Sequence, residues 1–365
     1  MFFDRFRDAL SRLPTGLIRP GPAADPKDLA AAEAALGRQL PSAFGSFLRS
    51  FDGADLFHEA VVLAGVGAEA PRQLLDLNPD RPLDELVFAE TVTGDRFAFR
   101  ADGAVVRLRA ADEDSGEQEE RWLAGSNFTA WLDALVAHER VLYGPDGEWA
   151  PDAFEPDGAE ILPLSALRQA ERALKLDPGA AELHHERAIA LRRLGREDTA
   201  LQAFREAAAL DAENPWAAFD LGRAALATGV GGAREALEAF ERAGRLDNGE
   251  AGARFWIWGA RAAQLLALPE RLTACRREAL ARVPTLAADL RRARDAAGAG
   301  DEPEALAEAE SLVAALEEPI GTGRSRLTVV TEETPPQKKT PVDANRPVQE
   351  KPIKEQKRGT KPPLR

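Results

Sequence analysis

Residues 198–211 read DTALQAFREAAALD, and this stretch predicts the fold of the second half of the chain. Ala200, Phe204, Ala207 and Leu210 recur at i, i+4, i+7 and i+10, which places them on one face of an α-helix. Small and large apolar side chains alternate along this face. The pattern therefore predicts a helix that packs closely between two others.

The same pattern occurs three times at a nearly constant spacing. The counterparts lie 34 positions upstream, at Ala166, Ala170, Ala173, Leu176 and Asp177, and 36 positions downstream, at Ala236, Phe240, Ala243, Leu246 and Asp247. A period of this length is typical of stacked helical hairpins, and such arrays bind other proteins. We also expect helix pairs without the pattern at Phe255–Leu268 with Pro269–Arg282, and at Thr285–Ala297 with Pro303–Leu316.

Length and charge indicate two folded domains and a tail within 365 residues. We expect an α+β domain over residues 1–162, an all-α helical-repeat array over 163–318, and a disordered, basic, Pro- and Lys-rich tail over 319–365. Residues 1–160 carry 15 Lys+Arg and 30 Asp+Glu, and the whole chain has a net charge of −14. The folded part lacks the clustered positive charge that nucleic-acid binding requires.

Other residue types exclude several classes of protein. The single cysteine, Cys275, allows neither an internal disulfide nor a metal site made of several cysteines. The first ten residues include four charges, so they do not resemble a signal peptide, and no apolar run is long enough to span a bilayer. We therefore expect a cytoplasmic protein without a membrane partner.

The first half begins with three predicted helices. The first buries Phe2, Phe3, Phe6, Leu10 and Leu13 and ends at Pro14. A Pro/Gly-rich link, Arg19–Ala24, follows it. Asp25 is the expected N-cap of the second helix, which Gly37 ends. The third starts at Pro41 and buries a face made of Leu40, Phe44, Phe47, Leu48 and Phe51.

Strands are expected next, at Val61–Ala64 and Leu86–Ala89, followed by a hairpin over Asp95–Arg109. Asp102-Gly103 favours a two-residue turn. That turn pairs Phe99 with Val106 and Phe97 with Leu108 on the core face. The other face would carry Arg96, Arg100, Arg107 and Arg109, with Arg96 opposite Arg109, an arrangement that needs neutralising charge.

The acidic segment Asp112–Glu120 has two interpretations. It is either a loop for metal binding, acid–base chemistry or docking, or a solvated loop. In the second case it folds back on the hairpin side that carries the four arginines. We favour the second, because carboxylates need burial or coupling to reach catalytic pKa values. The domain then closes with a helix over Asn127–Val141, capped by Ser126, which buries Phe128, Trp131, Leu132 and Leu135. An irregular coil up to Pro163 follows, pinned by Tyr143, Trp149 and Phe154.

Residues 25–140 resemble the SUKH superfamily, the Smi/Knr-type domain. The resemblance rests on Leu36-Gly37-Arg38-Gln39-Leu40-Pro41 with Phe44, Phe47-Leu48 and Asp52-Gly53, on Gly94-Asp95-Arg96-Phe97, and on Ser126-Asn127-Phe128 with Trp131-Leu132. It implies an α+β domain without catalytic residues. Bacterial members of the family often neutralise toxins, frequently nucleases, and an acidic surface suits a basic partner. Alternatively, the acidity serves only solubility.

Residues 164–250 resemble the tetratricopeptide repeat. Gly195 with Ala200, Phe204, Ala207, Leu210 and Asp211 match one unit, and Leu221-Gly222, Gly229, Ala236, Phe240, Ala243, Leu246 and Asp247 match the next. Ala212 and Arg187-Ala188 depart from the pattern. Residues Leu164–Leu176 form a second helix without a first, so we expect the last helix and coil of the front domain to be its partner, docking the two domains rigidly.

The resemblance implies that first helices line a groove. The partner-binding positions would be His185, Arg192, Arg193, Trp216, Phe219 and Arg223, which suit an acidic or apolar segment. Alternatively, the rings pack against neighbouring helices and the arginines only face solvent. Adjacent His184 and His185 cannot share a metal. No catalytic, cofactor or metal motif occurs, so we expect no enzyme and no cofactor.

Two functions follow from this sequence. The first is a protein-binding module that neutralises a toxin, possessing an acidic SUKH-like domain and helical repeats, with a basic toxin domain as its partner. The alternative is a scaffold whose repeat groove binds the partner while the front domain is structural. An enzyme built on the acidic segment is the weakest interpretation.

Overall fold

The computed structural model describes residues 3–79, 85–109, 120–156, 158, 160–300 and 302–317. The chain divides into residues 1–322 and 323–365, and every described residue belongs to the first unit. Phe2, residues 112–119 of the acidic segment and the expected tail from residue 319 lie outside the described residues. The domain boundary near Pro163 stays a prediction.

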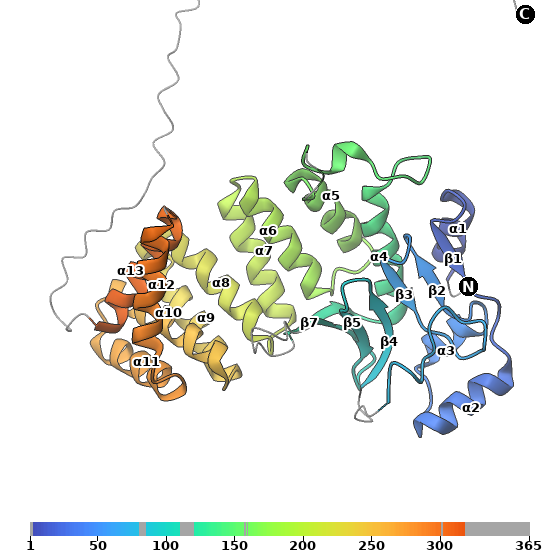
Figure 1. Ribbon diagram of the computed structural model, residues 1–365, viewed down its shortest axis with the longest axis horizontal. Coiled ribbons are helices and arrows are strands. Elements are labelled where there is room, and N and C mark those ends of the chain that lie inside the picture. Colours follow the sequence, from blue (N-terminus) through green and yellow to red (C-terminus); the bar gives the residue numbers. More distant parts are fainter. Residues whose placement is uncertain are drawn as a thin grey trace, which may run out of the picture. The chain divides into compact units, whose positions relative to one another are not determined.

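The described part of the front half contains one antiparallel sheet whose strands follow chain order (Figure 1). The strands are β1 Ile18–Pro20, β2 Ala54–Leu56, β3 Val61–Leu63, β4 Leu86–Thr91, β5 Arg96–Phe99, β6 Val105–Arg109 and β7 Glu120–Gly125. The α+β prediction is thus confirmed. Strand β1 corrects the expected link at Arg19–Ala24, because its three residues are too short to show an alternating pattern.

Four helices accompany this sheet, at α1 Asp4–Arg12, α2 Pro26–Leu36, α3 Ser42–Leu48 and α4 Phe128–Glu139. The core between sheet and helices is aromatic. Phe88 of β4 stacks on Phe99 of β5 at 4.3 Å between ring centroids, and both rings lie within 6 Å of Phe44 of α3 and Phe128 of α4. The cap predicted for α2 is confirmed, since the Asp25 carboxylate accepts from the Lys27 amide at 2.8 Å.

The predicted register of the hairpin is wrong by one residue. Phe97 pairs with Arg107 and Phe99 with Val105, not with Leu108 and Val106. The loop has three residues, because the amide of Arg100 donates to the carbonyl of Ala104 and Gly103 takes a left-handed φ of 84°. This slip moves every side chain of β6 to the other face, as a period of two requires.

The prediction that the four hairpin arginines share one face is therefore wrong. Arg107 and Arg109 lie on the face of Phe97, whereas Arg96 pairs with Leu108 on the opposite face. Arg109 faces Glu120 of β7 instead of another arginine.

The closing helix starts one residue later than predicted. Asn127, and not Ser126, is the N-cap, because the Asn127 side chain accepts from the amide of Ala130 at 3.1 Å. Phe128, Trp131 and Leu132 are buried as expected, while Leu135 is half-buried. Two short 3₁₀ helices follow, at η1 Arg140–Leu142 and η2 Pro151–Ala153.

Helices fill the rest of the described chain, in the order α5 Pro163–Leu174, α6 Ala181–Arg193, α7 Glu197–Leu210, α8 Pro215–Ala227, η3 Gly229–Gly231, α9 Ala233–Leu246, α10 Glu250–Leu265, α11 Pro269–Arg282, α12 Leu286–Ala299 and α13 Pro303–Glu317. The helical array is confirmed. Ala200, Phe204 and Ala207 are buried, but Leu210 is 41 % exposed. Leu210 ends α7, so no further helical turn covers it.

Helix α5 has the pattern of the second helix of a repeat, and α4 of the front domain takes the place of the first helix, as expected. It packs on α4 as well as on α6. Gln169 of α5 lies 3.3 Å from the imidazole of His138 on α4. Aromatic side chains also hold the coil after α4, as expected. Tyr143 is buried, and Trp149 stacks on it with 4.6 Å between the ring centroids.

Two glycines at turns offer a matched test of this fold. Gly53 and Gly103 both have left-handed φ angles, 81° and 84°. A Cβ at Gly53 would lie 2.6 Å from the carbonyl oxygen of Leu63, whereas one at Gly103 meets nothing within 4 Å. We expect Gly103→Ala to lower the free energy of unfolding by about 1 kcal/mol and Gly53→Ala by clearly more. Urea unfolding followed by circular dichroism measures both losses. Equal losses would contradict the close approach of the Leu63 carbonyl to Gly53.

Candidate functional site

The Asp52-Gly53 pair of the sequence signature has a structural task. Asp52 is buried, and its two carboxylate oxygens accept from the amides of Val66 and Gly67, each at 2.7 Å. Gly53 leaves room for the carbonyl of Leu63. The pair therefore fixes the loop after β3 and offers no free group for catalysis.

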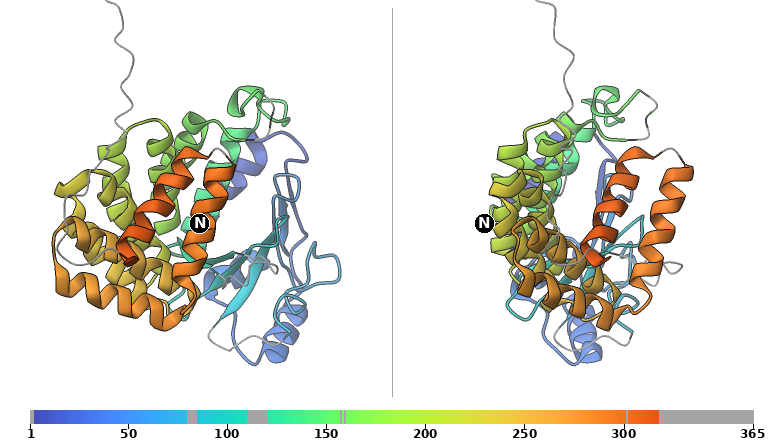
Figure 2. Two further views of the ribbon diagram at one scale, coloured as in Figure 1. Left: turned by 60° about the vertical axis from the view of Figure 1, so that its left-hand side comes forward. Right: turned by 90° about the vertical axis from the view of Figure 1, so that its left-hand side faces the viewer.

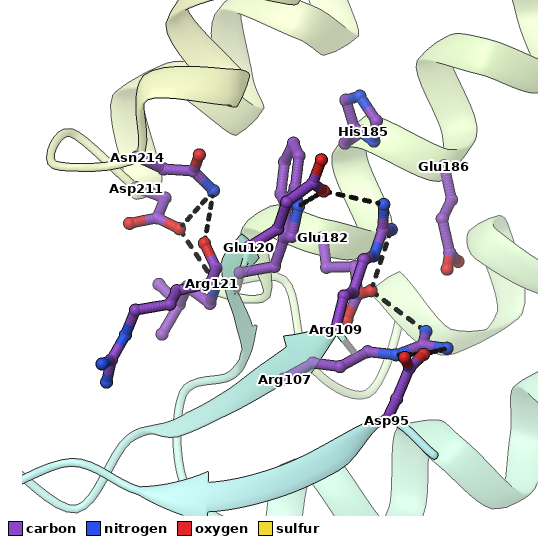
Figure 3. Close-up of polar contacts among 12 residues, drawn as sticks. Asp95, Arg107, Arg109, Glu120, Arg121, Glu182, His185, Glu186, Asp211 and Asn214 are labelled. Carbon is purple, nitrogen blue, oxygen red and sulfur yellow. Dashed lines mark hydrogen bonds and ion pairs between the residues drawn. The ribbon is translucent and has the colours of Figure 1, made fainter. Parts of the chain in front are cut away.

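The edge strand β7 is capped by turns of the helical array (Figure 3). The amide of Leu123 donates to Asp211 at 2.9 Å, and the side chain of Asn214 donates to the carbonyl of Arg121 at 2.8 Å. At the end of the strand, the amide of Ser126 donates to Asp177 at 2.8 Å. These side chains satisfy backbone groups that an open edge would leave unpaired.

The two aspartates occupy equivalent positions of consecutive repeats. Asp177 and Asp211 are 34 residues apart, each in the turn that follows a second helix. Among the described residues, their counterpart in the next unit, Asp247, accepts only from the amides of Gly249 and Gly252 at the start of α10. One repeat position thus serves the sheet twice and its own array once.

Beside this edge, an ion-pair network joins β6 to α6. The buried carboxylate of Glu182 accepts from Arg107 at 3.1 Å and from Arg109 at 3.4 Å, and Arg107 also binds Asp95 at 2.6 Å (Figure 3). Burial opposes the charge of Arg107, but Glu182 and Asp95 outweigh it and raise the pKa of this guanidinium above its ordinary value. The charge required beside the hairpin arginines therefore comes from Glu182 of α6, from Asp95 and from Glu120, which accepts from Arg109 at 3.4 Å.

His185 lies between the sheet and the array. Its ring packs in a tilted arrangement on the buried Trp122 of β7, with 4.2 Å between the ring centroids, and its Nε2 contacts Asp220 of α8 at 2.7 Å. Within the part of the chain that the structure describes, its Nδ1 has no hydrogen-bond partner. His185 thus connects three elements.

A second histidine bridges α4 and α6. His138 lies 3.1 Å from Glu186 and 3.0 Å from Glu139, and its side chain is 18 % exposed. Burial would lower the pKa of His138, but the charge of Glu186 and hydrogen bonds to both carboxylates raise it to about 10. Burial would raise the pKa of Glu186, but the imidazolium lowers it below its ordinary value. The pair is therefore ionic at neutral pH.

The predicted partner-binding residues do not share one surface. His185 and Phe219 are buried, and Trp216 is half-buried with its ring 5.0 Å from that of Phe255. Arg192 is exposed, with its guanidinium over the ring of Phe204. A partner can reach Arg192 and part of Trp216, whereas the two buried rings pack inside the array.

The remaining two arginines of the prediction have intramolecular partners. Arg193 donates to Glu160 of the coil at 2.8 Å, and Arg223 pairs with Glu308 of α13 at 3.3 Å. Sequence reasoning missed Trp122, Asp177, Asp211 and Asn214, although the recurrence of aspartate at one repeat position was a visible signal. Partner binding by the six residues stays a prediction.

No arrangement in the described residues resembles a cofactor or metal site. A shallow pocket of about 310 Å³ is lined by Glu85, Arg100, Ala101, Asp102 and Arg121, whose charges pair as Arg100 with Asp102 and Arg121 with Glu85. No group of three potential metal ligands occurs in this part of the chain. Among the same residues, no helix has both the length and the apolar character needed to cross a bilayer.

The front of the chain is thus an α+β sheet domain whose last strand and last helix pack on helical hairpins. The model of the SMI1 / KNR4 family (SUKH-1) matches residues 23–134, so the resemblance of this domain to the family is confirmed.

Two solved structures match part of this chain. The crystal structure of MamA is 18 % identical, covers 42 % of this chain and 88 % of its own, and has a TM-score of 0.32. The structure of YrrB, titled a TPR protein with an unusual peptide-binding site, is 19 % identical, covers 42 % and 78 %, and has a TM-score of 0.31. No curated protein matches the chain.

The capped edge can be tested with matched variants. Asp211→Ala leaves the amide of Leu123 without its acceptor in a part-buried position, so we expect a loss of about 1–3 kcal/mol in the free energy of unfolding. Hydrogen exchange at Leu123 should quicken at least tenfold. Asp247→Ala is the control, because it removes only the cap of α10 and should leave exchange at Leu123 unchanged. Slow exchange at Leu123 in both variants would contradict the contact.

The His138 pair predicts a loss of stability at alkaline pH. Its folded pKa, about 10, lies above the ordinary 6.5, so its contribution is full below pH 6.5 and is lost as pH rises towards 10. This group can add a slope of up to about 1.4 kcal/mol per pH unit in that range. We expect His138→Gln to flatten the slope and His58→Gln, at an exposed position, to preserve it. An NMR titration showing His138 deprotonated at pH 8 would contradict this.

Proposed function

We propose that this chain is a non-enzymatic protein-binding protein of the toxin-neutralising kind, with an acidic SUKH-1 domain as its recognition module. The observation that carries the proposal is the family match over residues 23–134 in a half of the chain with twice as many acidic as basic residues. Such charge favours a basic partner and accelerates its association.

The two edges of the sheet restrict how a partner binds. The β7 edge is capped by Asp211, Asn214 and Asp177. The other edge strand, β1, has three residues and ends in Pro20, which has no amide hydrogen to donate. A partner therefore contacts side-chain surfaces and does not extend the sheet.

The coil after α4 provides such a surface, which we call the Trp149 patch and define as Asp146, Glu148, Trp149 and Asp152. All four side chains are exposed, and the indole is 52 % exposed while stacked on the buried Tyr143. No lysine or arginine occurs from residue 141 to residue 167. A rigid aromatic ring beside carboxylates suits an arginine or lysine of a basic protein.

The alternative function is a scaffold whose array binds the partner. Arg192 and Arg254 favour it, since both are exposed and their guanidinium groups lie over Phe204 and Phe219. These groups suit an acidic or apolar segment, as expected from the sequence. In this case the SUKH-1 domain only supports the array.

Charge-changing variants of the full chain separate the two functions. We would co-express the chain with the protein encoded beside its gene, measure growth, and determine the affinity of the purified pair by calorimetry. The first function predicts that Glu148→Lys with Trp149→Ala weakens binding at least tenfold and abolishes protection. Arg192→Glu with Arg254→Glu should then change the affinity less than twofold.

The reverse order of effects would support the scaffold. If the neighbouring protein binds the wild-type chain with no change on raising the salt concentration from 50 to 500 mM, charge complementarity is excluded. If no neighbouring protein inhibits growth or binds, the toxin-neutralising function is rejected.

A further inference from the structure

Helix α13, the last helix in the described residues, makes contacts that a regular helical hairpin of the array does not need. It packs on α10 as well as on α12. In Figure 2 it lies between α12 and the other helices of the array in the right-hand view. Leu312, Ala315 and Leu316 of α13 belong to the core of the array, and Arg276 of α11 donates to the carbonyl of Ala315 at 2.5 Å. By contrast, α12 buries only Ala297.

The first half of α13 meets a cationic surface, which we call the arginine face and define as Arg223 of α8 with Trp258 and Arg261 of α10. The guanidinium carbons of the two arginines lie 5.1 and 5.0 Å from the indole centroid, so one ring contacts both cations. Glu308 of α13 accepts from Arg223 at 3.3 Å. The occupant of this face is therefore a carboxylate on a helix.

The arginine face is not fully satisfied by α13. Within the described residues Arg261 has no ion-pair partner, and the buried Nε1 of Trp258 has no acceptor. Burial lowers the pKa of Arg261; Glu308 opposes this decrease and Arg223 adds to it, so the pKa stays below its ordinary value. A second carboxylate or carbonyl oxygen at this position would pair with Arg261 and accept a hydrogen bond from Nε1 of Trp258.

The chemistry of α13 identifies what the face recognises. Residues 303–317 read PEALAEAESLVAALE and contain four glutamates and no lysine or arginine. Their apolar side chains Leu312, Val313 and Leu316 are buried. Residues 251–300 carry 9 Lys+Arg and 4 Asp+Glu, so the occupant and its site have complementary charge.

We propose that the arginine face is a binding site for an acidic amphipathic helix, and that α13 is its intramolecular occupant. A partner helix of the same chemistry competes with α13 and supplies oxygen atoms that pair with Arg261 and with Nε1 of Trp258. The start of α13 is suited to this exchange, because residues 303–305 are exposed and Glu308 is the contact with Arg223. The inference concerns the array alone and does not depend on toxin neutralisation.

Hydrogen exchange of the full chain tests the occupancy. Glu308→Arg and Arg223→Glu each place like charges together, so each should speed exchange in residues 303–317 at least tenfold. The charge swap carrying both substitutions should restore slow exchange. Glu310→Arg, the same change at an exposed position of α13, is the control and should have no effect. Unchanged exchange in the single variants, or no recovery in the swap, would overturn the assignment.

Peptide binding tests recognition itself. The probe is a fluorescein-labelled peptide with the sequence of residues 303–317, followed by anisotropy. The Glu308→Ala chain should bind it at least tenfold more tightly than the wild type, because its own helix competes less well. Adding Arg261→Glu should abolish binding, and a peptide with arginine in place of the second glutamate should not bind. Equal affinity for the wild-type and Glu308→Ala chains would exclude competition by α13.

Discussion

The arrangement of the whole described chain depends on how the backbone of β7 is satisfied at its outer edge. An edge strand presents unpaired amides and carbonyls that must find partners. Here Asp211 and Asn214 bind the backbone of Leu123 and Arg121, and Asp177 binds that of Ser126. Three residues of an extended strand cover about 10 Å, which is on the scale of the 8–10 Å between packed helices. Aspartates of consecutive repeats can therefore reach the same strand, and the repeat spacing sets the position of the sheet on the array.

The charged contacts beside this edge add direction to the docking. Removing two charges from water costs nearly as much as their attraction returns, so a buried ion pair is a weak source of net stability. Its geometry is demanding, however. Glu182 is buried and reaches Arg107 and Arg109 on one strand, while Trp122 on the next strand packs on the ring of His185 of the same helix. Only one rotation of α6 over the sheet satisfies both contacts. We infer that the network fixes the orientation and that the apolar cores supply most of the stability.

Sequence reasoning predicted the features that depend on neighbours in the chain. Helix caps such as Asp25, the helical period through Phe204 and the aromatic core residues Phe44 and Phe128 follow from local pattern and hydrophobicity. The hairpin register did not, because glycine in the left-handed region fits a two-residue turn and a three-residue loop equally well. The burial of His185 was equally hidden, since its environment comes from Trp122 in the other half of the chain. Leu210 shows the limit of a face argument, because the face ends where the helix ends.

The use of one repeat position in different ways divides the array into two parts. Asp177 and Asp211 face the sheet, so the turns that carry them are occupied by the front domain, whereas Asp247 serves only its own helix pair. Two surfaces away from these turns remain for other molecules, the Trp149 patch in the coil after α4 and the arginine face on α8 and α10. Their charges are opposite, because carboxylates surround the exposed indole and guanidinium groups surround the buried one. A single ligand of one charge cannot satisfy both. We therefore propose that a basic surface binds at the Trp149 patch and an acidic helix at the arginine face, where α13 is the intramolecular occupant.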